Sequence, residues 1–121
     1  MNTADMSCLS PHAFQHLGCR DVRTVDGITL EDHIFLISQL PCCAQLALPF
    51  WAKITGRITN NREEETLLAV VATLLDNDGL PLAQYSDVMV LDAGEKGEFE
   101  VKLIEHHDRA DAYRLTVEET E

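Results

Sequence analysis

The chain has 121 residues, 45% of them hydrophobic and 25% charged, and its formal net charge is −12. Such a composition is typical of one soluble globular domain and excludes a chain that is disordered throughout. The acidic excess also argues against nucleic acid as a partner, because a surface of this sign repels phosphate.

Hydropathy along the chain predicts no membrane insertion. The longest apolar stretch, Leu46 to Trp51, contains Pro49 and is far shorter than the ~20 apolar residues of a spanning helix. Residues 1–6 carry no basic side chain and no apolar core, so they do not resemble a secretory signal. We therefore expect a cytoplasmic protein, with an extracellular location as the alternative if a leader was removed.

Residues 1–47 are expected to form an N-terminal extension packed on the domain that follows. Ser10 and Pro11 are typical of a helix start and Gly18 of a helix end, so this pattern predicts one short helix. A crossover is expected at residues 38–49, where a short helix and an irregular segment fit equally well.

Between the predicted helix and the crossover, the sequence indicates a β-hairpin. Asp26 and Gly27 separate two β-prone runs, and an Asp-Gly pair in this setting is a strong hairpin signal. The second strand is expected to continue through Phe35 and Ile37. The extension is therefore predicted to comprise a short helix, a hairpin and a crossover.

Residues 48–121 show the pattern of an antiparallel β-sandwich. Apolar and polar residues alternate from Phe50 to Thr59, which predicts a half-buried strand. Residues 66–75 are apolar at nearly every position, and the Asp-Asn-Asp-Gly turn at 76–79 favours a strand there over a helix. Further strands are predicted within 80–91, 98–104 and 112–118. The predicted fold class is all-β, an immunoglobulin-like antiparallel β-sandwich.

Three motifs in this region carry a family resemblance. They are Ile54-Thr55-Gly56-Arg57-Ile58-Thr59-Asn60, Thr73-Leu74-Leu75-Asp76-Asn77-Asp78-Gly79, and Asp92-Ala93-Gly94-Glu95 followed by Phe99-Glu100-Val101. They resemble the Gly-x-(Val/Ile)-x-Asn, Leu-Tyr-Asp-x-x-Gly and Pro-Gly-Glu…Phe-x-Val elements of FxLYD-type domains, which are small immunoglobulin-like modules common in archaea and bacteria. The resemblance covers about 70 residues, from Ala52 to Val117.

The chain departs from this family pattern at three positions. Ala72, Leu75 and Ala93 stand where the family has Phe, Tyr and Pro. Each replacement keeps an apolar or turn-compatible residue, so the implied immunoglobulin-like fold is unchanged. No catalytic residues are recognised in that family, so the resemblance implies a fold and no activity.

The resemblance also implies structural roles for four residues. Gly56 would allow a close approach of two backbones, Asn60 and Gly79 would form turns, and Phe99 would fill the core.

One constellation near the N-terminus suggests a metal site. Cys8, His12, His16 and Cys19 supply two thiolates and two imidazoles, which suffice for tetrahedral zinc, and the two histidines share one face of the predicted helix. Their spacing matches no common zinc motif, so thiols and imidazoles without metal are the simpler interpretation. We expect no cofactor, with zinc at these residues as the alternative.

The sequence contains no nucleophile elbow, no phosphate loop and no zinc-protease helix, so we expect no enzyme. The first hypothesis is a non-catalytic interaction or structural module that binds a protein partner, or itself, through a sheet edge or an apolar patch. The candidates for that patch are Ile34, Phe35, Leu48, Phe50 and Trp51.

Two alternative functions stay open. One is a small metal-binding protein that uses the N-terminal Cys and His residues. The other is an acidic inhibitor of a basic or nucleic-acid-binding partner, which requires the carboxylates to gather on one face. The candidate clusters are Glu63-Glu64-Glu65 and Glu118-Glu119-Glu121.

Overall fold

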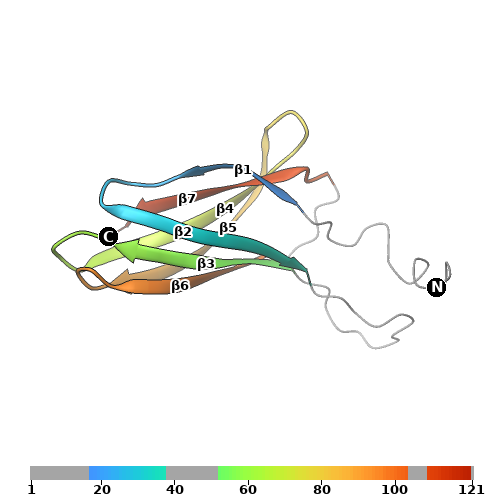
Figure 1. The fold of residues 1–121 in the computed structure, drawn as a ribbon. Coiled ribbons are helices and arrows are strands. Elements are labelled where there is room, and N and C mark those ends of the chain that lie inside the picture. Colours follow the sequence, from blue (N-terminus) through green and yellow to red (C-terminus); the bar gives the residue numbers. More distant parts are fainter. Residues whose placement is uncertain (1–16, 38–51, 104–108, 121) are drawn as a thin grey trace, which may run out of the picture.

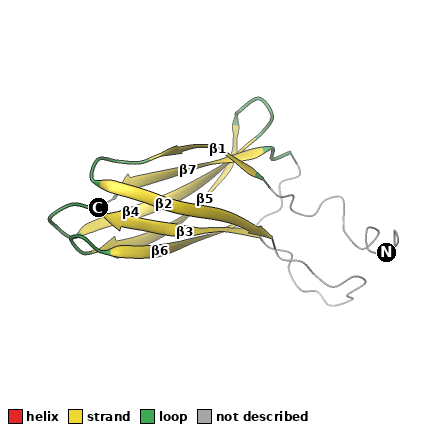
Figure 2. Ribbon diagram, viewed as in Figure 1, coloured by secondary structure: helices red, strands yellow, loops and turns green. Residues whose placement is uncertain are grey.

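The structure is a computed structural model that describes residues 17–37, 52–103 and 109–120, and these form seven β-strands in two sheets. All of the regular elements in the described ranges are strands, as Figure 2 shows. The described residues contain no helix that could cross a membrane. The all-β prediction is confirmed, and the predicted N-terminal helix falls almost entirely outside the described residues.

The two sheets lie face to face in a sandwich-like arrangement (Figure 1). The four-stranded sheet has the order β1-β7-β4-β5, with bounds Gly18–Arg23, Ala112–Glu119, Thr66–Leu75 and Pro81–Leu91. The three-stranded sheet has the order β2-β3-β6, with bounds Ile28–Ile37, Ala52–Asn60 and Lys96–Leu103.

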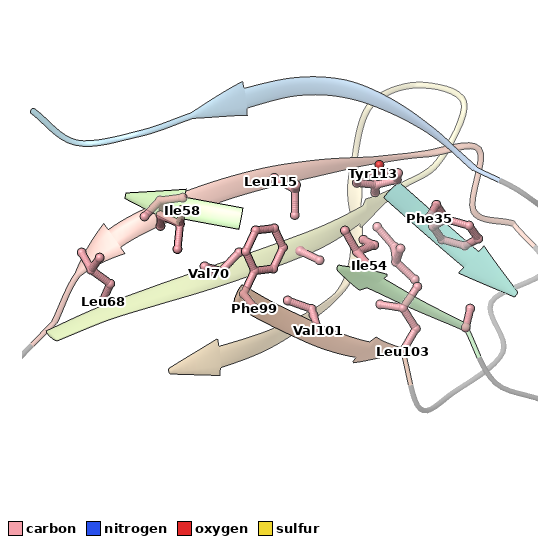
Figure 3. Close-up of a cluster of buried hydrophobic side chains, with 14 of the residues drawn as sticks. Phe35, Ile54, Ile58, Leu68, Val70, Phe99, Val101, Leu103, Tyr113 and Leu115 are labelled. Atoms are coloured by element: carbon pink, nitrogen blue, oxygen red, sulfur yellow. The ribbon is translucent and has the colours of Figure 1, made fainter. Parts of the chain in front are cut away.

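The core lies between the sheets and follows from the alternation of the strands. Figure 3 shows Ile54 on β3, Val70 on β4, Phe99 on β6 and Leu115 on β7 meeting between the two layers. Along most of β3, β4, β6 and β7 alternate residues are buried, because successive side chains of a strand lie on opposite faces. The expected alternation along residues 52–59 and the expected strand at residues 66–75 are both confirmed.

The predicted β-hairpin around Asp26 and Gly27 is wrong. A turn does form, with Gly27 at a φ of 84° and a hydrogen bond of 3.2 Å from Ile28 N to Val25 O. It joins strands of different sheets, however, because β1 pairs in parallel with β7 and β2 pairs antiparallel with β3. Four residues separate the two strands, and this link carries the chain from one sheet to the other.

Gly18 is the first residue of β1 and not the end of a helix. The strands β1 and β2 are thus members of the two sheets, although both lie within the range that the sequence assigns to an extension. The second of them ends at Ile37, as expected from its pattern.

Gly56 allows the close approach that the resemblance implies. A Cβ atom at this position would lie 2.2 Å from the backbone oxygen of Asp32 and 2.6 Å from Cζ of Phe99. The register of β2 on β3 shifts between Leu30 and Asp32, so a bulge of β2 is pressed against β3 just here. Only glycine leaves room for both the bulge and the Phe99 ring.

The turn after β4 is also as predicted. Asp76 Oδ1 accepts hydrogen bonds of 2.9 Å from the backbone N–H groups of both Asp78 and Leu80, and Gly79 has a φ of 81°. The strands on either side, β4 and β5, pair antiparallel. This hairpin places β5 at the edge of the four-stranded sheet.

Candidate functional site

The outer faces of the two sheets differ in chemistry, although Ile34 and Leu36 also leave exposed aliphatic surface on the three-stranded sheet. On the three-stranded sheet, charges of opposite sign alternate across β2, β3 and β6. The ion pairs on this face are Lys53–Glu100 at 2.9 Å, Lys96–Glu31 at 3.7 Å, Lys102–Glu100 at 3.8 Å, and Arg57–Asp32. A shallow hollow of about 430 Å³ on this face is lined in part by the Arg57–Asp32 ion pair. This is the pattern of a solvated surface.

The outer face of the four-stranded sheet carries a cluster of aliphatic side chains on β4 and β5, beside polar residues of β7 such as Thr116 and Glu118. We call the aliphatic face the set Leu67, Ala69 and Val71 on β4 with Val88 and Val90 on β5. Across the two strands Leu67 lies opposite Val90, and Ala69 lies opposite Val88. Val88 is 57% exposed and Val90 is 52% exposed, which is unusual for valines on neighbouring positions of one face.

Strand β5 is also an edge strand, because it has a hydrogen-bonded neighbour on one side alone among the described strands. Thr120 N donates to Leu67 O at 2.9 Å, so Leu67 directs its backbone groups toward β7. The next residue, Leu68, must then bond to Met89 of β5, since neighbouring residues of a strand direct their N–H and C=O groups to opposite sides. Consequently Ser86, Val88 and Val90 direct their backbone N–H and C=O groups away from β4.

A shallow groove of about 520 Å³ runs beside this edge, between β5 and the edge strand β6 of the other sheet. It is lined by Tyr85, Ser86, Asp87, Glu100 and Lys102. Asp87 Oδ2 accepts a hydrogen bond of 2.8 Å from the backbone N–H of Glu100. The Asp87 side chain of β5 therefore caps a backbone donor on the β6 edge.

Carboxylates gather at the end of the sandwich where β5 finishes. We use the name acidic end for a set of exposed residues in the loops after β3 and β5: Glu63, Glu64, Glu65, Asp92 and Glu95. The buried amide of Asn60 fastens them together, since Nδ2 donates to the backbone oxygens of Glu64, Leu91 and Asp92 at 2.9, 3.0 and 3.1 Å.

The C-terminal carboxylates join the same end. Arg62 Nη1 donates to Glu119 Oε1 at 2.7 Å, and Glu118 lies opposite Ala69 in the register of β7 on β4. The two clusters that the sequence singles out, Glu63-Glu64-Glu65 and the described part of Glu118-Glu119-Glu121, thus lie next to each other.

Of the predicted zinc ligands, Cys19 lies in a described region, and Cys8, His12 and His16 lie outside the described residues. The Cys19 thiol donates to the backbone oxygen of Asp21 at 3.4 Å and packs against the core. Burial is the main cause that raises the pKa of this thiol. In the described ranges, no group of three or more His, Cys, Asp or Glu side chains is arranged around a metal position. The zinc site stays a prediction.

A polar cluster near Cys19 ties β2 to β7. The Tyr113 hydroxyl lies 3.1 Å from His33 Nδ1, and the Phe35 ring stacks on Tyr113 with ring centroids 5.7 Å apart. Burial, with a smaller contribution from Cys19, raises the pKa of Tyr113 to about 12. The phenol stays protonated at neutral pH, and its contacts with His33 and Phe35 join the two sheets.

The apolar patch expected from the sequence is only partly correct. Ile34 is 55% exposed, but Phe35 is buried at 4% and belongs to the core. The other three candidates, Leu48, Phe50 and Trp51, lie outside the described residues. The aliphatic face was missed, although the uninterrupted apolar run of β4 and the alternating Val88 and Val90 were its signal.

Comparison with known proteins adds no relative. No family model matches the chain, and no curated protein sequence matches it.

Proposed function

We propose that this chain is a non-catalytic protein-interaction module that binds a partner protein on the aliphatic face. The exposure of Val88 and Val90 beside Leu67, Ala69 and Val71 is the observation that carries the proposal. The opposite outer face, with its ion pairs, provides the contrast within the same molecule. Contiguous exposed apolar surface on a soluble domain is typical of an interaction site.

The energetics favour docking on this face. Full burial of a valine side chain is worth about 1.5–3 kcal/mol relative to exposure. Two valines that are about half exposed, with three partly covered aliphatic neighbours, therefore leave several kcal/mol that a partner can recover. The face is flat because it follows a sheet, so it fits another sheet or an extended segment.

We further propose that the fold is immunoglobulin-like and of FxLYD type. Connections that change sheet between β3 and β4, β5 and β6, and β6 and β7 support this, because immunoglobulin-like sandwiches use Greek-key connections of that kind. Three family positions also have matching roles: Gly56 at a close backbone approach, Gly79 at positive φ and Phe99 in the core. A fold of this type commonly presents its faces and edges to protein partners.

The test compares two matched double variants of the full chain. Val88→Lys with Val90→Glu alters the aliphatic face without changing net charge. Ile34→Lys with Leu36→Glu makes the same changes at exposed aliphatic residues of the three-stranded sheet. Proteins captured from cell extract by the wild-type chain are identified, purified and titrated against all three chains by calorimetry.

We expect the wild-type chain and the Ile34/Leu36 variant to bind the purified partner with similar affinity. The Val88/Val90 variant should bind at least about tenfold more weakly, since two buried valine contacts are lost. Equal affinity of both variants would refute docking on the aliphatic face.

A further inference from the structure

We propose that the partner binds as an extended β-strand that pairs antiparallel with β5 and carries Lys or Arg where it passes the acidic end. This inference rests on the proposed function and names the occupant and its chemistry. The partner strand would have aliphatic residues at alternate positions, so that they extend the aliphatic face onto a fifth strand. It would belong to a different protein and not to a second copy of this chain.

The backbone of β5 is suited to receive a strand. Ser86, Val88 and Val90 direct their N–H and C=O groups outward, as the bond from Thr120 N to Leu67 O requires. The irregularity in the pairing of β4 with β5 lies at Leu74 and Leu75, near the start of β5. The rest of the edge is regular, and an edge of this kind is a template for pairing.

Each of the other three edges of the sheets carries a protective device along its length, whereas the pairing irregularity of β5 is confined to its start. Strand β1 is six residues long and has a register shift between Cys19 and Asp21. Strand β2 has a bulge between Leu30 and Asp32, and strand β6 has its Glu100 N–H capped by Asp87. Short edges, bulges and charged side chains are the usual means by which proteins prevent strand addition. The side chains that β5 presents outward, by contrast, are Gln84, Ser86, Val88 and Val90.

Charge identifies the occupant as basic at one end. A strand that pairs with the last residues of β5 passes the acidic end, where Glu65 and Asp92 flank the paired residues Thr66 and Leu91. The two cations next to the acidic end in the sequence are already engaged: Arg62 is bonded to Glu119, and Lys96 lies 3.7 Å from Glu31. Lys or Arg on the incoming strand would face carboxylates without displacing an existing pair.

The same charges disfavour a second copy of this chain. Two chains carry −12 each, and residues 81–91 contain one charged residue, Asp87, which is acidic. Antiparallel pairing of two β5 strands would also bring Asp76 and Asp78 of one copy toward Asp92 and Glu95 of the other. Like charges in such positions oppose association.

In an antiparallel pair, the N-terminus of the partner strand lies beside the C-terminal end of β5. The basic residues of the partner therefore precede its aliphatic residues in sequence. A synthetic peptide with three basic residues followed by alternating valine and threonine is the matching probe. The same peptide with three glutamates in place of the basic residues is its control.

Binding is followed by amide chemical shifts of the full chain. We expect the basic peptide to shift amides of β5 and its neighbours. The acidic peptide should bind at least about tenfold more weakly than the basic one. Added salt should lower the affinity of the basic peptide. Equal binding of the two peptides, or shifts centred away from β5, would overturn the inference.

The variant Ser86→Pro tests the backbone pairing directly. Proline is tolerated on an edge strand where the N–H points away from the sheet, so the chain should fold, yet an incoming strand loses a hydrogen bond and meets the ring. Ser86→Ala, which keeps the N–H, is the control. We expect Ser86→Pro to abolish peptide binding and Ser86→Ala to bind like the wild type.

A peptide methylated on alternate backbone nitrogens makes the same test on the unaltered chain, so the outcome does not depend on the folding of Ser86→Pro. Unchanged binding of this peptide would refute strand addition. Loss of the captured partner in the Val88/Val90 variant but not in Ser86→Pro would leave docking on the aliphatic face standing without strand addition. Retention of that partner by both variants would refute the proposed function as well.

Discussion

Asn60 shows how one buried side chain organises an end of the sandwich. The residue is fully buried, its Nδ2 donates to three backbone oxygens, and its Oδ1 accepts from Arg62 N at 2.9 Å. The bonds join the end of β3 to the loops that follow β3 and β5. The acidic end therefore exists as a unit because one amide holds its loops together.

Replacement of Asn60 by alanine should lower the free energy of unfolding by about 3 kcal/mol, because it leaves several buried backbone groups without a partner. Asn61→Ala is the matched control: that side chain is exposed and makes one bond, of 2.7 Å to Thr29 Oγ1. Its effect should stay within about 0.5 kcal/mol. Urea denaturation measures both changes, and equal losses in the two variants would contradict this role of Asn60.

The sequence predicts the role of a single residue where a local rule applies. The turn roles implied for Asn60 and Gly79 and the close approach at Gly56 depend on short stretches of chain, and the structure agrees with them. Phe35 was assigned to a surface patch because its strand was known but its neighbours were not. Its stacking on Tyr113 joins residues 78 positions apart, and no local pattern predicts such a contact.

Strand β1, at the edge of the four-stranded sheet, is held to its neighbour β7 by a side-chain ion pair as well as by backbone pairing. Asp21 of β1 accepts hydrogen bonds from Arg114 Nε at 2.8 Å and from Arg23 Nε at 3.1 Å. These bonds hold the pKa of the Asp21 carboxyl below its ordinary value, and the bond with Arg114 contributes most. The contribution of Asp21 to stability is therefore fully present at a pH above the ordinary aspartate pKa. It is lost as the pH falls below about 4.

We expect Asp21→Asn to raise hydrogen exchange at the amides of β1 by a few-fold while those of β4, which is paired on both sides, keep their protection. The wild-type chain should show the same loosening of β1 as the pH is lowered, once the intrinsic pH dependence of exchange is subtracted. Asp32→Asn, which removes a carboxylate paired with Arg57 on the other sheet, is the control. Faster exchange in β1 of that variant too would mean that Asp21 has no specific role.

Element types were predictable, but the order of the strands was not. An uninterrupted apolar run such as β4 is usually read as a strand covered on both faces. Here one face of β4 lies in the core and the other belongs to the aliphatic face. The apolar run that predicts the strand therefore does not reveal that one of its faces is exposed. The parallel pairing of β1 with β7 likewise competes with a hairpin that the Asp26-Gly27 signal favours. Both outcomes depend on contacts distant in sequence, which local propensity does not contain.

For the whole molecule, the net charge of −12 acts on stability and on binding with opposite signs. Mutual repulsion of the carboxylates destabilises the compact state. Salt screens this repulsion, and it also screens the ion pairs on the three-stranded sheet, but exposed pairs of that kind contribute little to stability. The stability gained when salt relieves repulsion among the excess carboxylates should therefore exceed the stability lost when it screens the ion pairs.

Sodium chloride raised from low to molar concentration should accordingly stabilise the chain by about 1 kcal/mol, which raises the melting temperature by roughly 4 °C. The triple variant Glu63→Gln, Glu64→Gln, Glu65→Gln should melt higher at low salt and respond less to salt, because part of the repulsion is already removed. Calorimetric melting curves of both chains test this. A melting temperature that falls with salt would show that the ion pairs dominate.

The same salt series separates the electrostatics of folding from those of docking. A partner strand with basic residues loses affinity as salt screens the acidic end, while the fold gains stability. The triple variant should bind the basic peptide weakly at low salt, despite its higher melting temperature, because the carboxylates that attract the peptide are gone. Weaker binding by a more stable chain cannot be explained by partial unfolding. Such a result would show that the acidic end takes part in binding the peptide. Unchanged binding by the variant would show that the acidic end has no such role.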